Sequence, residues 1–155
     1  MSFQRVDRPS KGDIVRVHRK EHYYHYGIAV DENTVVHFTA LTEDITSNKK
    51  EMKIIETSLD KFLRGGQLEV QTPYDSRFTR DEVVEKAKRW VNCSQFRGKY
   101  YNLATNNCEH FARYCYYGSH KSNQVIQAAA ATAILGAVAV GVAAGTVVKK
   151  AVKKR

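Results

Sequence analysis

Residues 14–17 are apolar except for Arg16, and the alternation of apolar and polar positions from Val15 onward predicts a β-strand over this stretch. Four further short apolar stretches are also interpreted as strands, at residues 23–30, 34–38, 52–56 and 68–71. Turn-forming residues at 31–33 separate the second stretch from the third, so these two are expected to pair as an antiparallel hairpin. Leu59–Leu63 is interpreted as a single helical turn, because two glycines follow and would end it. Residues 1–11 show no such pattern and are expected to form a flexible N-terminal arm.

A longer helix is predicted after the strands. Thr79 is followed three residues later by Glu82, which is the pattern of a capping box at a helix start. An apolar stripe at helical spacing continues from there and predicts a helix over residues 80–91. The sequence thus changes from a strand period to a helix period at this point.

The last predicted helix of the globular part carries a cysteine in its first turn. Asn106 or Asn107 can cap the start of this helix, and Gly118 is expected to end it, so Cys108 lies next to the cap. Strands with antiparallel pairing, followed by helices, predict an α+β fold in which a small antiparallel β-sheet packs against helices.

Length and charge separate a globular part from a tail. A chain of 155 residues allows one globular domain, which we assign to residues 12–120. The formal net charge is +9, but five of the surplus positive charges lie in the basic tail at residues 149–155. The charge therefore gives little support for a nucleic acid partner, and none is expected.

Residues 128–148 are 21 consecutive uncharged residues, rich in Ala and Gly, that follow a linker at 121–127. As a helix rising about 1.5 Å per residue, this segment would match a hydrocarbon core of roughly 30 Å, so it predicts a membrane-anchor helix. Its modest apolarity leaves open a soluble or interfacial helix, or a tight hairpin that returns the tail to the same side. A stripe of small residues at spacing four would permit self-association in the membrane. The stripe consists of Ala133, Ala137, Gly141 and Gly145.

The N-terminal residues contain no apolar segment typical of a signal peptide. We therefore expect a single-pass C-terminal anchor with the globular domain in the cytoplasm. The chain has three cysteines, an odd number that argues against a disulfide framework and for reduced thiols.

Cys108 is the best candidate for a nucleophile. A thiol in the first turn of a helix faces the positive end of the helix dipole and several unpaired amides, and both favour the reactive thiolate. Free cysteines are also among the most buried residues, so a packing role is the alternative, and it is the expected role of Cys93 and Cys115.

A thiol nucleophile needs a base, and the hairpin supplies two histidines. His110 follows Cys108 by two positions, a rotation of about 200° around a helix, so it points away. If the hairpin turn has three residues, Gly27 opposes His37, and His25 becomes the diagonal neighbour of His37 on the same face, about 7–8 Å away. A two-residue turn would place the two histidines on opposite faces.

The same histidine and cysteine side chains could instead hold zinc, and His22 adds a further histidine near His25. Their spacing matches no compact zinc signature. No metal or other cofactor is therefore expected.

Three blocks together resemble the lecithin retinol acyltransferase-like family, which includes the H-Ras-like suppressor group of small phospholipase A/acyltransferases. The blocks are His-Tyr-Gly-Ile-Ala-Val at 25–30, Val-Val-His-Phe at 35–38 and Asn-Cys-Glu-His-Phe at 107–111. The resemblance implies a circularly permuted papain-like fold. It also implies that Cys108 is the nucleophile, His25 the general base and His37 the polar residue that orients this base.

The resemblance further implies an enzyme that uses a membrane phospholipid as acyl donor. Cys108 would attack the ester to form a thioester and release a lysophospholipid, and water, an amine or an alcohol such as a lysolipid would then take the acyl chain. Tyr23 precedes His25 by two positions on the same strand face, which makes it a candidate donor to the oxyanion.

Three other functions stay open. A retinol acyltransferase, forming retinyl esters, has similar residues around His25 and Cys108, whereas the short stretch between His37 and Cys108 favours the phospholipid enzymes. A membrane-tethered cysteine peptidase could use the same site. A non-enzymatic lipid-remodelling module would use the anchor alone.

Overall fold

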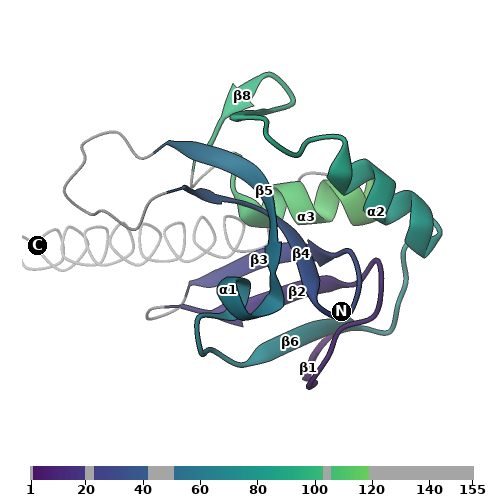
Figure 1. The fold of residues 1–155 in the computed structure, drawn as a ribbon. Coiled ribbons are helices and arrows are strands. Elements are labelled where there is room, and N and C mark those ends of the chain that lie inside the picture. The colour runs from purple at the N-terminus through teal and green to yellow at the C-terminus, as the bar shows by residue number, and fades with distance from the viewer. Residues whose placement is uncertain (1, 20–22, 42–50, 103–105, 119–155) are drawn as a thin grey trace, which may run out of the picture. The chain divides into compact units, whose positions relative to one another are not determined.

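The computed structural model describes residues 2–19, 23–41, 51–102 and 106–118 (Figure 1). Six strands form one antiparallel sheet in the order β1-β6-β2-β3-β4-β5. The strands are β1 (Ser2–Arg5), β2 (Ile14–His18), β3 (Tyr24–Ala29), β4 (Thr34–Ala40), β5 (Met52–Ser58) and β6 (Leu68–Thr72). The helices are α1 (Leu59–Leu63), α2 (Arg80–Lys88) and α3 (Cys108–Tyr117), and a small hairpin consists of β7 (Gln95–Phe96) and β8 (Lys99–Tyr100). The α+β class with a mostly antiparallel sheet is confirmed.

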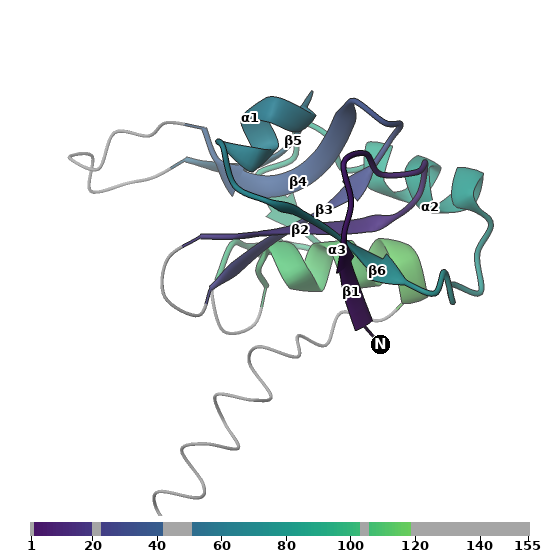
Figure 2. The same ribbon diagram turned by 90° about the horizontal axis from the view of Figure 1, so that it is seen from below.

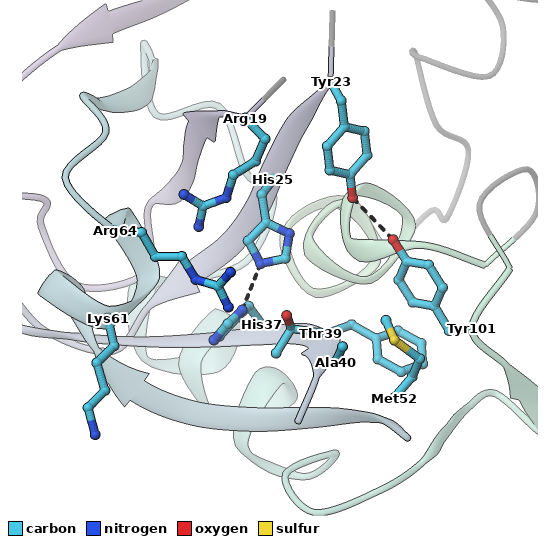
Figure 3. Close-up of a pocket in the computed structure, with 11 residues that line it drawn as sticks. Arg19, Tyr23, His25, His37, Thr39, Ala40, Met52, Lys61, Arg64 and Tyr101 are labelled. Atoms are coloured by element: carbon cyan, nitrogen blue, oxygen red, sulfur yellow. Dashed lines mark hydrogen bonds between the residues drawn. The ribbon is translucent and has the colours of Figure 1, made fainter. Parts of the chain in front are cut away.

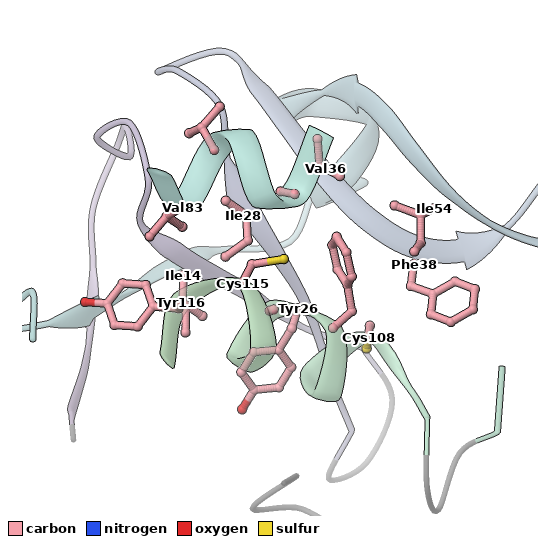
Figure 4. Packing of buried hydrophobic residues seen from close by; sticks show 14 of the residues in the cluster. Ile14, Tyr26, Ile28, Val36, Phe38, Ile54, Val83, Cys108, Cys115 and Tyr116 are labelled. Atoms are coloured by element: carbon pink, nitrogen blue, oxygen red, sulfur yellow. The ribbon is translucent and has the colours of Figure 1, made fainter. Parts of the chain in front are cut away.

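Helices cover both faces of the sheet, α1 one face and α3 the other (Figure 2). Because side chains alternate along each strand, the two faces have separate hydrophobic cores. Ile28, Val36 and Phe38 pack with residues of α2 and α3 (Figure 4), whereas Ala29 and Val35 pack with α1.

The local signals at the helix ends are confirmed. Thr79 and Glu82 form both hydrogen bonds of the capping box at the start of α2. Asn107 caps α3, and Gly118 ends it in the left-handed conformation, with φ of 73°. The other candidate cap, Asn106, instead donates hydrogen bonds to carbonyl groups of the β7–β8 hairpin.

Three elements differ from the prediction. Ser2–Arg5 is not part of a loose arm but an edge strand on β6, because its side chains find distant partners: Phe3 packs against Tyr26, and the Arg16 guanidinium lies 3.8 Å from the centre of the Phe3 ring. Helix α2 ends at Lys88 rather than at 91, since Asn92 adopts φ of 70° and its backbone N–H bonds to the Ile54 carbonyl on β5. The β7–β8 hairpin was not predicted.

In the part of the chain that the structure describes, no helix is long and apolar enough to cross a membrane. The predicted linker, anchor helix and basic tail, and the small-residue stripe of Ala133, Ala137, Gly141 and Gly145, lie outside the described residues.

Candidate active site

The site lies where β3 and β4 separate. The two strands pair only at Ile28 with Val36 and at Ala29 with Val35, although both continue beyond these pairs. This register is the one expected for a three-residue turn, and the backbone N–H of Val30 donates to the Thr34 carbonyl to close it. Past the last pair, the strands leave a gap in the sheet that α3 approaches from one face and α1 from the other.

His25 and His37 face each other across this gap. The Nε2 atom of His25 lies 2.7 Å from Nδ1 of His37, and both rings are buried, with 7% and 5% of their surface exposed. The Phe62 ring of α1 contacts both imidazoles, at centroid distances of 5.3 Å and 5.2 Å. Gly27 leaves room for Phe62 and Val35 to pack at this place, because a Cβ atom at residue 27 would lie 2.5 Å from a Val35 methyl group and 3.2 Å from the Phe62 ring.

Burial keeps the two imidazoles neutral. Desolvation is the main cause that lowers the pKa of His25 well below its usual value of 6.5, and the charges of His37, Arg19 and Arg64 act in the same direction. Burial and the two arginines likewise lower the pKa of His37 to about 3. A neutral imidazole is the form that accepts a proton, so the pair is suited to base chemistry near neutral pH.

Cys108 begins α3 and is completely buried. Its Sγ atom lies 3.1 Å from the hydroxyl oxygen of Tyr23, and it also interacts with the backbone N–H of Tyr26, which the strand separation leaves available. Burial is the largest influence and raises the pKa of the thiol, although these contacts oppose the shift. The helix start was expected to favour the thiolate, but burial outweighs this influence on the pKa, so the thiol of Cys108 rests protonated.

Tyr101 is a site residue that the sequence analysis missed. Its hydroxyl oxygen lies 3.1 Å from that of Tyr23, and both phenols hydrogen-bond with the Cys108 thiol. Burial raises the pKa of both phenols, so they remain protonated and able to donate. Tyr101 follows β8 in an irregular segment with no periodic pattern, and only its closeness in sequence to Cys108 could have suggested it.

A cavity of about 300 Å³ opens beside the histidines (Figure 3). Tyr23, His25, His37 and Tyr101 line it, together with Phe38, Thr39, Ala40 and Met52 and three basic residues, Arg19, Lys61 and Arg64. Cys108 itself is not among the lining residues, but its thiol contacts the hydroxyl groups of two of them, Tyr23 and Tyr101. No hydrogen bond joins His25 to Cys108 among the described residues.

The other histidines and cysteines considered in the sequence analysis are not part of this cluster. His110 Nδ1 lies 2.8 Å from Asn107 Oδ1, so its imidazole takes part in the cap of α3. Cys115 is buried in the core, and Cys93 is half-buried where the chain passes β5. His22 lies outside the described residues.

Comparison with known proteins finds a matching family model and several relatives. Residues 7–121 match the family model described as lecithin retinol acyltransferase. Mouse lecithin retinol acyltransferase is 32% identical over 137 residues, which cover 74% of this chain and 57% of the mouse protein. Human phospholipase A and acyltransferase 2 is 30% identical over 149 residues, 89% of this chain and 84% of the human protein. The chain thus spans a little over half the length of the retinol enzyme but most of the length of the second relative.

Proposed function

Because this chain belongs to the lecithin retinol acyltransferase family, we propose that it is a thiol acyltransferase and phospholipase that removes an acyl chain from a phospholipid. The acyl chain passes through a thioester on Cys108 to water, an amine or a lysolipid. The order of the residues, with both histidines on the sheet before the cysteine on its helix, supports a circularly permuted papain-like domain.

The observation that carries the proposal is the arrangement of one thiol, two phenols and two neutral imidazoles at the gap between β3 and β4. A protonated thiol needs a base, and His25 can serve if its proton resides on Nε2 and is donated to His37 Nδ1. The Nδ1 atom of His25 is then free to accept the thiol proton. His37 orients the base and stabilises the imidazolium that forms.

The reaction then proceeds in two halves. The Cys108 sulfur attacks the ester carbonyl, and the oxyanion accepts hydrogen bonds from the phenols of Tyr23 and Tyr101. The carbon–oxygen bond breaks, and the leaving lysophospholipid takes the proton from His25. An acceptor next attacks the thioester while His25 removes its proton, and the free thiol is restored.

We further propose that residues 128–148 anchor the enzyme to the membrane that holds its substrate, with the domain on the cytoplasmic side. Tethering makes the encounter between site and bilayer effectively intramolecular. An anchor of this kind would suit a substrate that lies in the membrane, and so favours a lipid over a peptide.

Retinol is a second candidate acceptor, and the similarity to mouse lecithin retinol acyltransferase favours testing it. The full-length protein in mixed micelles is incubated with a diacyl phosphatidylcholine, alone and with phosphatidylethanolamine, lysophosphatidylcholine or retinol. We expect an acyl adduct on Cys108 by mass spectrometry and release of lysophospholipid. Retinyl ester as the main product would select the second candidate. Cleavage of a peptide library or no turnover of any lipid would favour the peptidase or the non-enzymatic module.

A further inference from the structure

Positive charge collects at one side of the cavity beside the histidines. Arg19 and Arg64 lie next to the imidazoles, and Lys61 extends further along α1, whereas Ala40, Met52 and Tyr101 form the opposite, more apolar side (Figure 3). Among the described residues that line the cavity, none carries a carboxylate. The described lining residues therefore present positive charge to a ligand from one side of the cavity.

Arg19 holds the end of α1 that carries this charge. Its guanidinium donates hydrogen bonds to the carbonyl oxygens of Phe62 and Leu63 at the helix end, at 2.9 Å for Leu63, whose carbonyl also accepts from the backbone N–H of Gly66. Arg64 follows directly as the C-cap. Arg19 therefore holds the helix end from which the Arg64 side chain extends toward the same cavity.

The backbone at Arg64 adopts the left-handed conformation that commonly ends a helix. Its φ of 51° and ψ of 41° lie in the left-handed region, which few non-glycine residues adopt and which glycine adopts without strain. Gly65 comes next and has positive φ as well. An arginine at this position, where glycine would fit without strain, places a guanidinium beside two catalytic candidates.

We propose that Arg64 binds the phosphodiester group of the phospholipid donor, with Arg19 fixing the turn and adding charge; this inference rests on the proposed function. A phosphodiester is a singly charged anion, and a guanidinium can donate two parallel hydrogen bonds to its oxygens. With the phosphate at Arg64, the ester extends toward Tyr23 and Tyr101, and the acyl chain lies on the apolar side. Retinol and neutral peptides have no group for this position.

A second cavity provides space for the rest of the headgroup. It has a volume of about 490 Å³ and shares Arg19, Tyr23 and Arg64 with the first cavity, while His18 and Gly66 complete its lining. A phosphate bound at Arg64 would therefore leave its alcohol substituent pointing away from the scissile ester. The two cavities together give separate places to the headgroup and to the reacting ester.

The substitution Arg64→Gly separates binding from folding, because it removes the charge and relieves the backbone strain at once. We expect the KM for a monomeric short-chain phosphatidylcholine to rise about tenfold. The KM for a diacylglycerol of the same chains should not change, and the melting temperature should stay equal or rise. Arg64→Lys should restore part of the lower KM for phosphatidylcholine. Arg97→Gly is the matched control, since Arg97 also has positive φ, 53°, but lies outside the cavity; it should leave both KM values unchanged. Equal changes for both substrates, or no change for phosphatidylcholine, would overturn the proposal.

A binding measurement tests the same site without turnover. Glycerophosphocholine is titrated into full-length Cys108→Ala and into the double variant that also carries Arg64→Gly, and heat of binding is recorded. We expect binding by the first protein and about tenfold weaker binding by the second. Absence of binding by Cys108→Ala, or equal binding by both proteins, overturns the phosphodiester site. If binding depends on Arg64 while the parent protein with Cys108 intact shows no acyl transfer, the phosphodiester site stands and the proposed function is removed.

Discussion

The hydroxyl oxygen of Tyr23 lies 3.1 Å from the sulfur of Cys108, a residue 85 positions later in the chain. Tyr101 extends this contact into a cluster of two phenols and one thiol. Because burial raises the pKa of both phenols, each keeps its proton and can donate to a thiolate or to an oxyanion. The cluster therefore places two hydrogen-bond donors at a buried, protonated thiol.

Replacing either phenol tests this donor role. Tyr23→Phe and Tyr101→Phe remove one hydrogen bond each from the developing charge, and loss of one such donor reduces kcat by about 10²-fold or more. Steady-state kinetics on a short-chain phospholipid measure the effect. Tyr100→Phe is the control, because Tyr100 is 69% exposed and adjacent to Tyr101. Full kcat in Tyr101→Phe would remove this residue from the mechanism.

Substitution of the proposed nucleophile should abolish transfer without unfolding the domain. Cys108→Ala and Cys108→Ser both lose the thiol at the start of α3, and Ser keeps nearly the same shape. We expect no acyl adduct and no lysophospholipid, with the far-ultraviolet circular dichroism of the parent protein. Cys115→Ser controls for loss of a buried thiol elsewhere in α3. Substantial activity in Cys108→Ala would refute the thioester route.

The two histidines should differ in their importance. His25→Asn removes the base and should lower kcat by about 10²- to 10⁴-fold. His37→Asn or His37→Gln can still hold the His25 imidazole by a hydrogen bond, so we expect a smaller loss. Comparison of kcat for the three variants measures the difference. Equal losses would mean that the roles are shared or reversed.

The buried histidines should make the fold sensitive to acid. An unfolded histidine titrates near 6.5, whereas burial lowers the pKa of His37 to about 3, so between these values the unfolded chain binds more protons. Stability should therefore be unaffected by His37 above pH 6.5 and fall as the pH drops toward 3, by up to roughly 1.4 kcal/mol per pH unit. Urea unfolding between pH 7 and pH 4 measures this slope. The slope should be smaller in His37→Asn, and an equal slope would contradict the prediction.

Removal of residues 125–155 should separate membrane attachment from chemistry. We expect the shortened protein to lose activity on vesicles and to keep its activity on short-chain or detergent-dispersed lipid, since the described site lies before residue 119. Flotation with vesicles and two parallel activity assays measure this. A glycosylation tag at the C-terminus of the full chain then distinguishes a spanning segment, which exposes the tag to modification, from a hairpin or interfacial helix, which does not.

Much of the fold could be predicted because its signals are local. The strands of the β3–β4 hairpin, its three-residue turn and the caps of α2 and α3 depend on residues close together in sequence. The edge strand Ser2–Arg5 could not be predicted, because it is held by β6 and by Arg16. The early end of α2 has a similar origin in backbone bonds to Ile54.

The candidate site divides in the same way. The sequence predicts the positions of the candidate nucleophile and of the histidine pair, because a helix cap places Cys108 at the start of α3 and the register of one hairpin brings His25 and His37 to the same face. Only the tertiary structure decided that the thiol is protonated, that Tyr101 shares it with Tyr23, and that two arginines flank the histidines. The physical reason is that dihedral preferences and side-chain alternation act over a few residues, whereas desolvation and charge depend on everything that folding brings within a few ångströms of a group, whatever its distance along the chain.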